Sequence, residues 1–136
     1  MLAGIVNYLL GLIYFLDRQS LFDELKIASR MDQAKLIMSN NFHLNISSYE
    51  IAESLCMSYS YFRKLFKEYT GYTPKRYLTG LKIEKSKELL TTTSLYLKEI
   101  SLAVGIENVE HFCNLFKKNV KITPTAYRNK TQGKFK

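Results

Sequence analysis

An internal repeat of about fifty residues restricts the possible folds of this sequence more than any other feature does. Seven positions recur with the same residue type fifty positions later. They are Phe62, Leu65, Phe66, Lys67, Thr73, Pro74 and Tyr77, which correspond to Phe112, Leu115, Phe116, Lys117, Thr123, Pro124 and Tyr127. Upstream the offset falls to 49, because Glu50-Ile51 corresponds to Glu99-Ile100. Since turns absorb insertions and packed helices do not, the pattern predicts two helix-turn-helix units.

The first copy contains the start and stop signals of two helices. Ser47 followed by Glu50 forms a capping box, so a helix is expected to begin directly after Ser47. Ser58 or Ser60 can cap the next helix, and Gly71 tolerates the left-handed conformation that ends it. The apolar residues expected on the inward face of this second helix are Phe62, Leu65, Phe66 and Tyr69.

The second copy repeats these signals. Gly105 marks its turn and Asn108 the cap of its second helix. Its apolar positions are Ile100, Ala103 and Val104 in the first helix and Val109, Phe112, Leu115 and Phe116 in the second.

The faces opposite the apolar positions differ in charge between the two copies. In the first copy this face holds Ser60, Arg63, Lys64 and Lys67, with three positive charges, and in the second it holds Glu110, Cys113, Asn114 and Lys117, with no net charge. We therefore expect the first unit to contribute more than the second to the binding of an anionic partner.

A long helix is predicted between the two copies. Pro74 suits the first turn of a helix, and apolar residues continue at helical spacing as far as Leu90. A helix over residues 74–91 would fix the distance between the two units. Its outward cations, which can contact phosphates or remain in solvent, are Lys75, Arg76, Lys82, Lys85 and Lys87.

The first 16 residues are apolar and follow a heptad pattern. Leu2, Leu9 and Leu16 fall on one seam position, with Ile5 and Leu12 on the other. About 20 residues are needed to cross a bilayer, so the segment is short for a membrane span, and it lacks the basic start of a signal peptide. Three interpretations remain open: a packing or dimerisation helix, the end of a missing upstream domain, and membrane association. Residues 21–30 either continue this helix or form a second one.

The net charge of +8 is concentrated in one part of the chain. Residues 1–45 contain four basic and four acidic side chains, so the whole surplus lies in residues 46–136. A basic block of this kind is typical of modules that bind nucleic acid or an anionic membrane surface. A basic helical interaction or membrane-surface module without sequence-specific DNA binding is therefore the alternative function.

Nothing in the sequence indicates catalysis. There are no paired carboxylates, no nucleophile beside a base, and no glycine-rich phosphate loop. Cys56, Cys113, His43 and His111 lack the usual spacing of metal ligands. We therefore expect no catalytic residues, no metal and no cofactor.

Residues 31–128 resemble the DNA-binding domain of the AraC/XylS family of bacterial transcription regulators. The residues that carry the resemblance are Ile100–Ile106, Phe112, Phe116–Lys118 and Thr123–Arg128, together with Lys82–Glu84 and Leu89–Leu90 in the connecting helix. The resemblance implies an all-α fold of about seven helices, in which a long linker helix joins two helix-turn-helix subdomains and an apolar N-terminal helix precedes them.

The resemblance also implies a division of the chain. The expected segments are a helical leader at 1–30 (the remnant of a sensor or dimerisation domain), a first subdomain at 31–73, the linker helix at 74–91, a second subdomain at 92–128 and a basic tail at 129–136. The chain is then a fragment of a longer regulator.

A function follows from the same resemblance. It implies a cytoplasmic transcriptional activator, associated with the nucleoid, that binds double-stranded DNA sequence-specifically through two recognition helices in successive major grooves. The implied partners are DNA, RNA polymerase, and a second copy bound through residues 1–16; no membrane is expected.

The outward faces supply candidates for DNA contact. Arg63 suits a bidentate contact to guanine, Asn114 can pair with adenine, and Glu110 can accept from the cytosine amino group. The full set of base-reading candidates is Ser60, Arg63, Lys64, Glu110, His111 and Asn114, and the phosphate candidates are Lys67, Lys75, Arg76, Lys117 and Lys118. Tyr59 and Tyr61 either stack on sugars or cover the helix start.

One departure from the family pattern affects the backbone. Lys121 stands where Gly is usual and where the first copy has Gly71. The second recognition helix is therefore expected to end in a strained cap that costs on the order of 1 kcal/mol.

Overall fold

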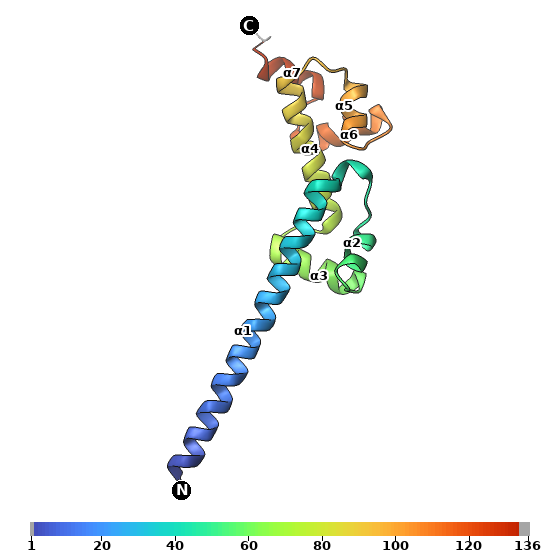
Figure 1. Ribbon diagram of the computed structural model, residues 1–136. Helices are drawn as coiled ribbons and strands as arrows, with labels where there is room; N and C mark the ends of the chain where they lie inside the picture. The colour runs from blue at the N-terminus through green and yellow to red at the C-terminus, as the bar shows by residue number, and fades with distance from the viewer. Residues whose placement is uncertain (1, 134–136) are drawn as a thin grey trace.

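Seven α-helices and one short 3-10 helix occur within residues 2–133, the part of the chain that the computed structural model describes (Figure 1). The α-helices are α1 (Leu2–Asn41), α2 (Ser48–Ser54), α3 (Tyr59–Thr70), α4 (Pro74–Thr92), α5 (Leu97–Ala103), α6 (Val109–Val120) and α7 (Pro124–Thr131), and the 3-10 helix η1 spans Phe42–Leu44. This confirms the all-α fold with two helix-turn-helix units, α2–α3 and α5–α6, joined by a long helix. Residue 1 of the expected leader and residues 134–136 of the expected tail lie outside the described range.

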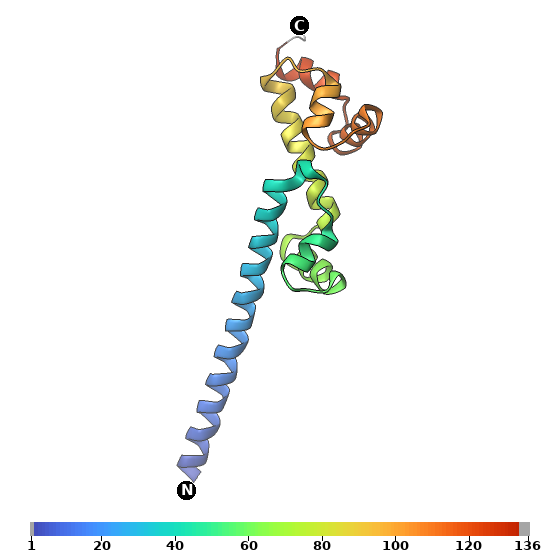
Figure 2. The same ribbon diagram turned by 45° about the vertical axis from the view of Figure 1, so that its right-hand side comes forward.

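The apolar leader and the first part of the expected subdomain 31–73 form one continuous helix, α1. No Gly or Pro occurs between Leu12 and Asn41 to interrupt it, so residues 21–30 continue the helix. Residues 2–26 are exposed and project away from the rest of the molecule (Figures 1 and 2). Burial begins only further on, at Met31, Ala34 and Met38.

Each helix-turn-helix unit has its own hydrophobic core, and the two cores repeat the same aromatic arrangement. The rings of Phe62 and Phe66 lie 5.6 Å apart, and Phe66 meets Tyr77 edge-on at 5.3 Å. In the second copy the corresponding distances are 6.1 Å for Phe112–Phe116 and 5.6 Å for Phe116–Tyr127. The aromatic residues shared by the two copies thus pack each recognition helix against the helix that follows it.

Helix α4 contributes to both cores and so fixes the two units relative to each other. Leu78 and Leu81 near its start pack against the first core, whereas Ile83 and Leu90 are buried in the second. Near its end the carbonyl of Leu90 accepts hydrogen bonds from Arg128 Nε at 3.2 Å and Gln132 Nε2 at 2.9 Å. The two units follow one another along α4 (Figures 1 and 2).

Two residues expected at inward positions are exposed instead. Tyr69 in α3 is 44% exposed, and Ala103 at the end of α5 is also exposed. Both lie in the last turn of a helix, and the inward positions beside them are filled by Phe66 and Val104, which are fully buried.

Candidate nucleic-acid interface

The first candidate recognition helix, α3, begins and ends at the residues that the sequence indicates. Of the two possible caps, Ser58 is the one used, because its hydroxyl accepts from the Tyr61 amide at 3.3 Å. Ser60 therefore lies within the helix with its side chain exposed. Gly71 ends the helix in the left-handed conformation, with φ of 83°.

The outward face of α3 gathers the predicted contact residues in one place. Ser60, Arg63, Lys64 and Lys67 line a shallow depression of about 360 Å³, together with Tyr59 and Thr73. Three of these side chains are cations, and no acidic residue is among the described residues that line the depression. The surface suits a ligand that is polyanionic and offers hydrogen-bond acceptors, because arginine and lysine only donate.

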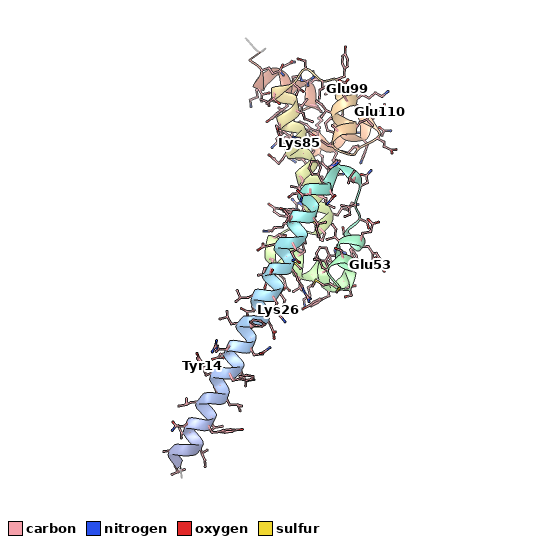
Figure 3. The ribbon with its side chains drawn as sticks, in the orientation of Figure 1. Tyr14, Lys26, Glu53, Lys85, Glu99 and Glu110 are labelled. Atoms are coloured by element: carbon pink, nitrogen blue, oxygen red, sulfur yellow. The ribbon has the colours of Figure 1, made fainter. Side chains whose placement is uncertain are left out.

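The second candidate recognition helix, α6, repeats this arrangement. Asn108 caps it by accepting from the His111 amide at 3.0 Å. The side chains of Glu110, His111, Asn114 and Lys117 are exposed along α6. Figure 3 shows Glu110 on the side of the α5–α6 unit away from α4.

One residue of the predicted α6 face is turned partly toward the core. Cys113 is half-buried and packs against the second core, so its prediction as an outward residue is wrong. Burial, and secondarily the charge of Glu110, raises the pKa of the Cys113 thiol. A short uncharged thiol is cheap to bury, whereas Arg63, which occupies the same position in the first copy, must keep its guanidinium in water.

The end of α6 has the strained cap that the sequence predicts. Lys121 has φ of 76°, in the left-handed region that favours glycine. Its amide donates to the Lys117 carbonyl at 2.8 Å, and its ammonium group donates to the Lys118 carbonyl at 3.1 Å. The side chain thus satisfies a carbonyl at the helix end, which offsets part of the backbone cost.

Four of the five candidate phosphate contacts line two neighbouring hollows. Lys67 lies in the depression beside α3. Lys75, Arg76 and Lys118 line a larger groove, of about 1010 Å³, between the two helix-turn-helix units. Lys117 is exposed on α6 but is not among the residues that line either one.

The larger groove also contains two more cations, Lys82 and Lys121. Lys82 is one of the outward cations that the sequence predicts on the connecting helix, whereas Lys121 directly follows α6 and is not among the predicted contact residues. Lys85 and Lys87 are different, because they form ion pairs with Glu88 and Glu84. Their spacing of three residues on one helix is a signal that the sequence does contain.

Residues 2–133 contain neither a membrane-spanning helix nor a cluster of metal ligands. No helix there is long and apolar enough to cross a membrane. No group of three or more His, Cys, Asp or Glu side chains that could hold a metal ion occurs within the same range.

A family model described as a helix-turn-helix domain matches residues 51–130. The HTH-type transcriptional regulator ArgR of Pseudomonas aeruginosa is 28% identical over 76% of this chain and 32% of its own. The lactose operon transcription activator of Staphylococcus xylosus is 30% identical over 92% of this chain and 46% of its own. The chain thus spans a third to a half of the length of these curated relatives.

Solved structures agree with the sequence comparisons. The C-terminal domain of the two-component response regulator yesN from Fusobacterium nucleatum is 34% identical, with a TM-score of 0.69 over 71% of this chain and 95% of its own. A transcriptional regulator with an AraC-type DNA-binding domain from Chromobacterium violaceum is 28% identical, with a TM-score of 0.72 over 76% of this chain and 93% of its own. The chain therefore belongs to the AraC family of DNA-binding transcriptional regulators, whose helix-turn-helix domain it carries.

Proposed function

We propose that this chain binds a specific site in double-stranded DNA, with α3 and α6 in successive major grooves on one face of the duplex. The main support is that both capped helices border the same groove: Tyr59 of α3 lines it on one side, and His111 and Lys118 of α6 line it on the other. Two helices held this way by one rigid linker can reach major grooves about one helical turn apart, roughly 34 Å.

The two recognition helices contribute unequally. In α3, Arg63 makes a bidentate contact to guanine, and Lys64 contacts a base or a phosphate. Ser60 contacts a base through its short side chain, whose hydroxyl can donate or accept. In α6, Asn114 pairs with adenine and Glu110 accepts from cytosine, with His111 at the helix start. The phosphate contacts are Lys67, Lys75, Arg76, Lys117 and Lys118, which fix the register without reading sequence.

The domain division is part of this proposal. Residues 31–73 and 92–128 are the two reading subdomains, residues 74–91 the linker and 129–136 a basic tail. Residues 1–30 are the leader, through which the first 16 pair with a second copy. The exposure of the seam residues, such as Leu9 at 49% and Leu12 at 44%, supports this role.

The proposed regulatory effect is activation of transcription in the cytoplasm, through contact with RNA polymerase at the promoter. Relatives named as activators support it, among them the lactose operon transcription activator and the HTH-type transcriptional activator RhaS of Escherichia coli. Membership in a family of transcription regulators favours a regulatory function over an enzymatic one.

Salt-dependent binding to duplex DNA tests this function against the membrane-surface alternative. Five phosphate contacts predict that log K falls with log salt concentration with a slope of about −4.5. The chain should not float with vesicles of anionic phospholipid in the same buffer. Vesicle binding without retention of duplex DNA would instead establish the membrane-surface function.

A further inference from the structure

The groove between the two helix-turn-helix units lies where DNA would cross from one recognition helix to the other. Residues of α4, including Lys75, Thr79 and Lys82, line it between the two units, Tyr59 borders it on the α3 side, and Leu115 borders it on the α6 side. Tyr59 and Thr73 also line the depression beside Arg63, so the two hollows are contiguous.

The groove is positively charged and its cations lack counter-charges. Lys75, Arg76, Lys82, Lys118 and Lys121 line it, and none of its described lining residues is acidic. The ion pairs within residues 2–133 are Lys85–Glu88 and Lys87–Glu84, which border a separate hollow on α4. Two α4 cations outside the groove, Lys85 and Lys87, are therefore paired with carboxylates of the same helix. The cations that line the groove have no ionic partner among the described residues.

Lys82 of α4 is one of these lining cations, and its side chain is held in place. Its ammonium group donates to the side-chain oxygen of Asn45 at 3.2 Å. Partial burial lowers the pKa of Lys82. Because an ammonium group has three donors and Asn45 is neutral, the contact fixes the position of the charge without compensating it. An anion in the groove would supply that compensation.

Asn45 is held in place by its backbone. It ends η1 in the left-handed conformation, with φ of 56°, which Asn tolerates better than most residues. Its side chain can therefore meet Lys82 from the opposite wall of the groove.

We propose that this groove binds the phosphodiester backbone between the two major grooves, and that Lys82 is its central phosphate contact. The proposal rests on the proposed DNA binding. When two helices lie in successive major grooves, the phosphodiester backbone of the duplex lies between them, so this backbone is the anion that meets the groove. Such a contact carries no sequence information and sets the register of both helices at once.

The test compares two variants with the same charge change on the same helix. Lys82→Gln removes the proposed contact, and Lys85→Gln removes a cation that is paired with Glu88. Both are titrated against a duplex selected by the wild-type chain, over a range of KCl concentrations. Lys82→Gln should reduce the salt slope by about 0.9 and weaken binding about eightfold at 0.1 M salt. Lys85→Gln should match the wild type, and Lys82→Arg should restore both quantities.

A second measurement needs no substitution in the protein. Methylphosphonate linkages, which are uncharged, replace the phosphates between the two contacted major grooves of the same duplex. Wild-type binding should weaken, and Lys82→Gln should weaken less, because it has already lost the Lys82 contact while Lys75, Arg76 and Lys118 still line the groove. Equal losses for both proteins, or no loss for the wild type, would overturn the role of Lys82.

These outcomes are separable from failure of DNA binding itself. If the chain does not bind duplex DNA, the wild type selects no duplex and Arg63→Ala has no effect. If DNA binding is right and the groove does not hold the backbone, Arg63→Ala weakens binding while Lys82→Gln and the uncharged linkages change nothing.

Discussion

The backbone of His43 lies directly against Gly105, so that a Cβ added to Gly105 would stand 2.6 Å from the His43 carbonyl oxygen. Gly105 is the turn of the second helix-turn-helix unit, and His43 belongs to η1, which continues α1. Phe42, the neighbour of His43, packs against the second core, whereas Met38 is buried in the first. The end of α1 thus joins the two units in addition to α4.

Substitution of Gly105 should therefore destabilise the domain. Gly105→Ala combines a left-handed φ of 81° with a clash against the backbone of His43. We expect the free energy of unfolding to fall by about 2–4 kcal/mol. Gly80→Ala is the matched control, because nothing lies within 4 Å of its Cβ position in α4; it should stabilise by up to ~1 kcal/mol. Urea denaturation measures both, and equal behaviour of the two variants would contradict the contact.

The two recognition helices should respond in opposite ways to changes at their ends. Lys121→Gly removes a non-glycine residue from φ of 76° and should raise the free energy of unfolding by up to ~1 kcal/mol. Gly71→Ala places a Cβ at φ of 83° and should lower it by about 1 kcal/mol. Thermal or urea unfolding measures the change in the free energy of unfolding of both variants. If Lys121→Gly destabilises, the bond from the Lys121 ammonium to the Lys118 carbonyl outweighs the strain.

The inequality of the two reading faces predicts unequal losses of DNA affinity. Arg63→Ala should cost about 1–3 kcal/mol because it removes a bidentate, charge-assisted contact. Asn114→Ala should cost less than ~1.5 kcal/mol, since a neutral amide is lost from a face without net charge. Titration of both on one duplex at one salt concentration gives the comparison. A larger loss for Asn114→Ala would refute the assignment of α3 as the stronger reader.

The projecting part of α1 should govern association and not folding. Residues 2–26 are exposed, so removing residues 1–25 should leave the free energy of unfolding of the domain unchanged. Sedimentation velocity should then show a change from dimer to monomer. Leu9→Asp places a charge on the seam and should do the same, whereas Asn7→Asp, outside the seam, should leave the dimer intact. A full chain that sediments as a monomer would contradict dimerisation through this segment.

Features that depend on neighbouring residues in the chain could be predicted from the sequence. The capping box of Ser47 and Glu50 is present in the structure, and so are the caps at Ser58 and Asn108. These interactions span three residues, so their signals are local. Helical spacing likewise predicted that two phenylalanines of each recognition helix face inward, and all four are fully buried: Phe62, Phe66, Phe112 and Phe116.

Features that depend on tertiary packing could not be predicted in this way. The burial of Cys113 depends on how α6 meets the second core, whereas its position opposite the apolar residues of the helix predicted an outward side chain. The groove around Lys82 requires Asn45, 37 positions earlier, to reach across to α4. The contact of His43 with Gly105 is made by the backbone, so the side chain of His43 gives no sign of it.

Selection of binding sites from a random duplex pool tests the central claim most directly, because it requires both recognition helices to read one duplex. Two short blocks of selected sequence should emerge, with centres about one turn, roughly 10–10.5 base pairs, apart. The block that weakens in a parallel selection with Arg63→Ala should be the more strongly specified one. Failure to enrich any sequence, or enrichment of a single block that Arg63→Ala leaves unchanged, would contradict two-groove reading by α3 and α6.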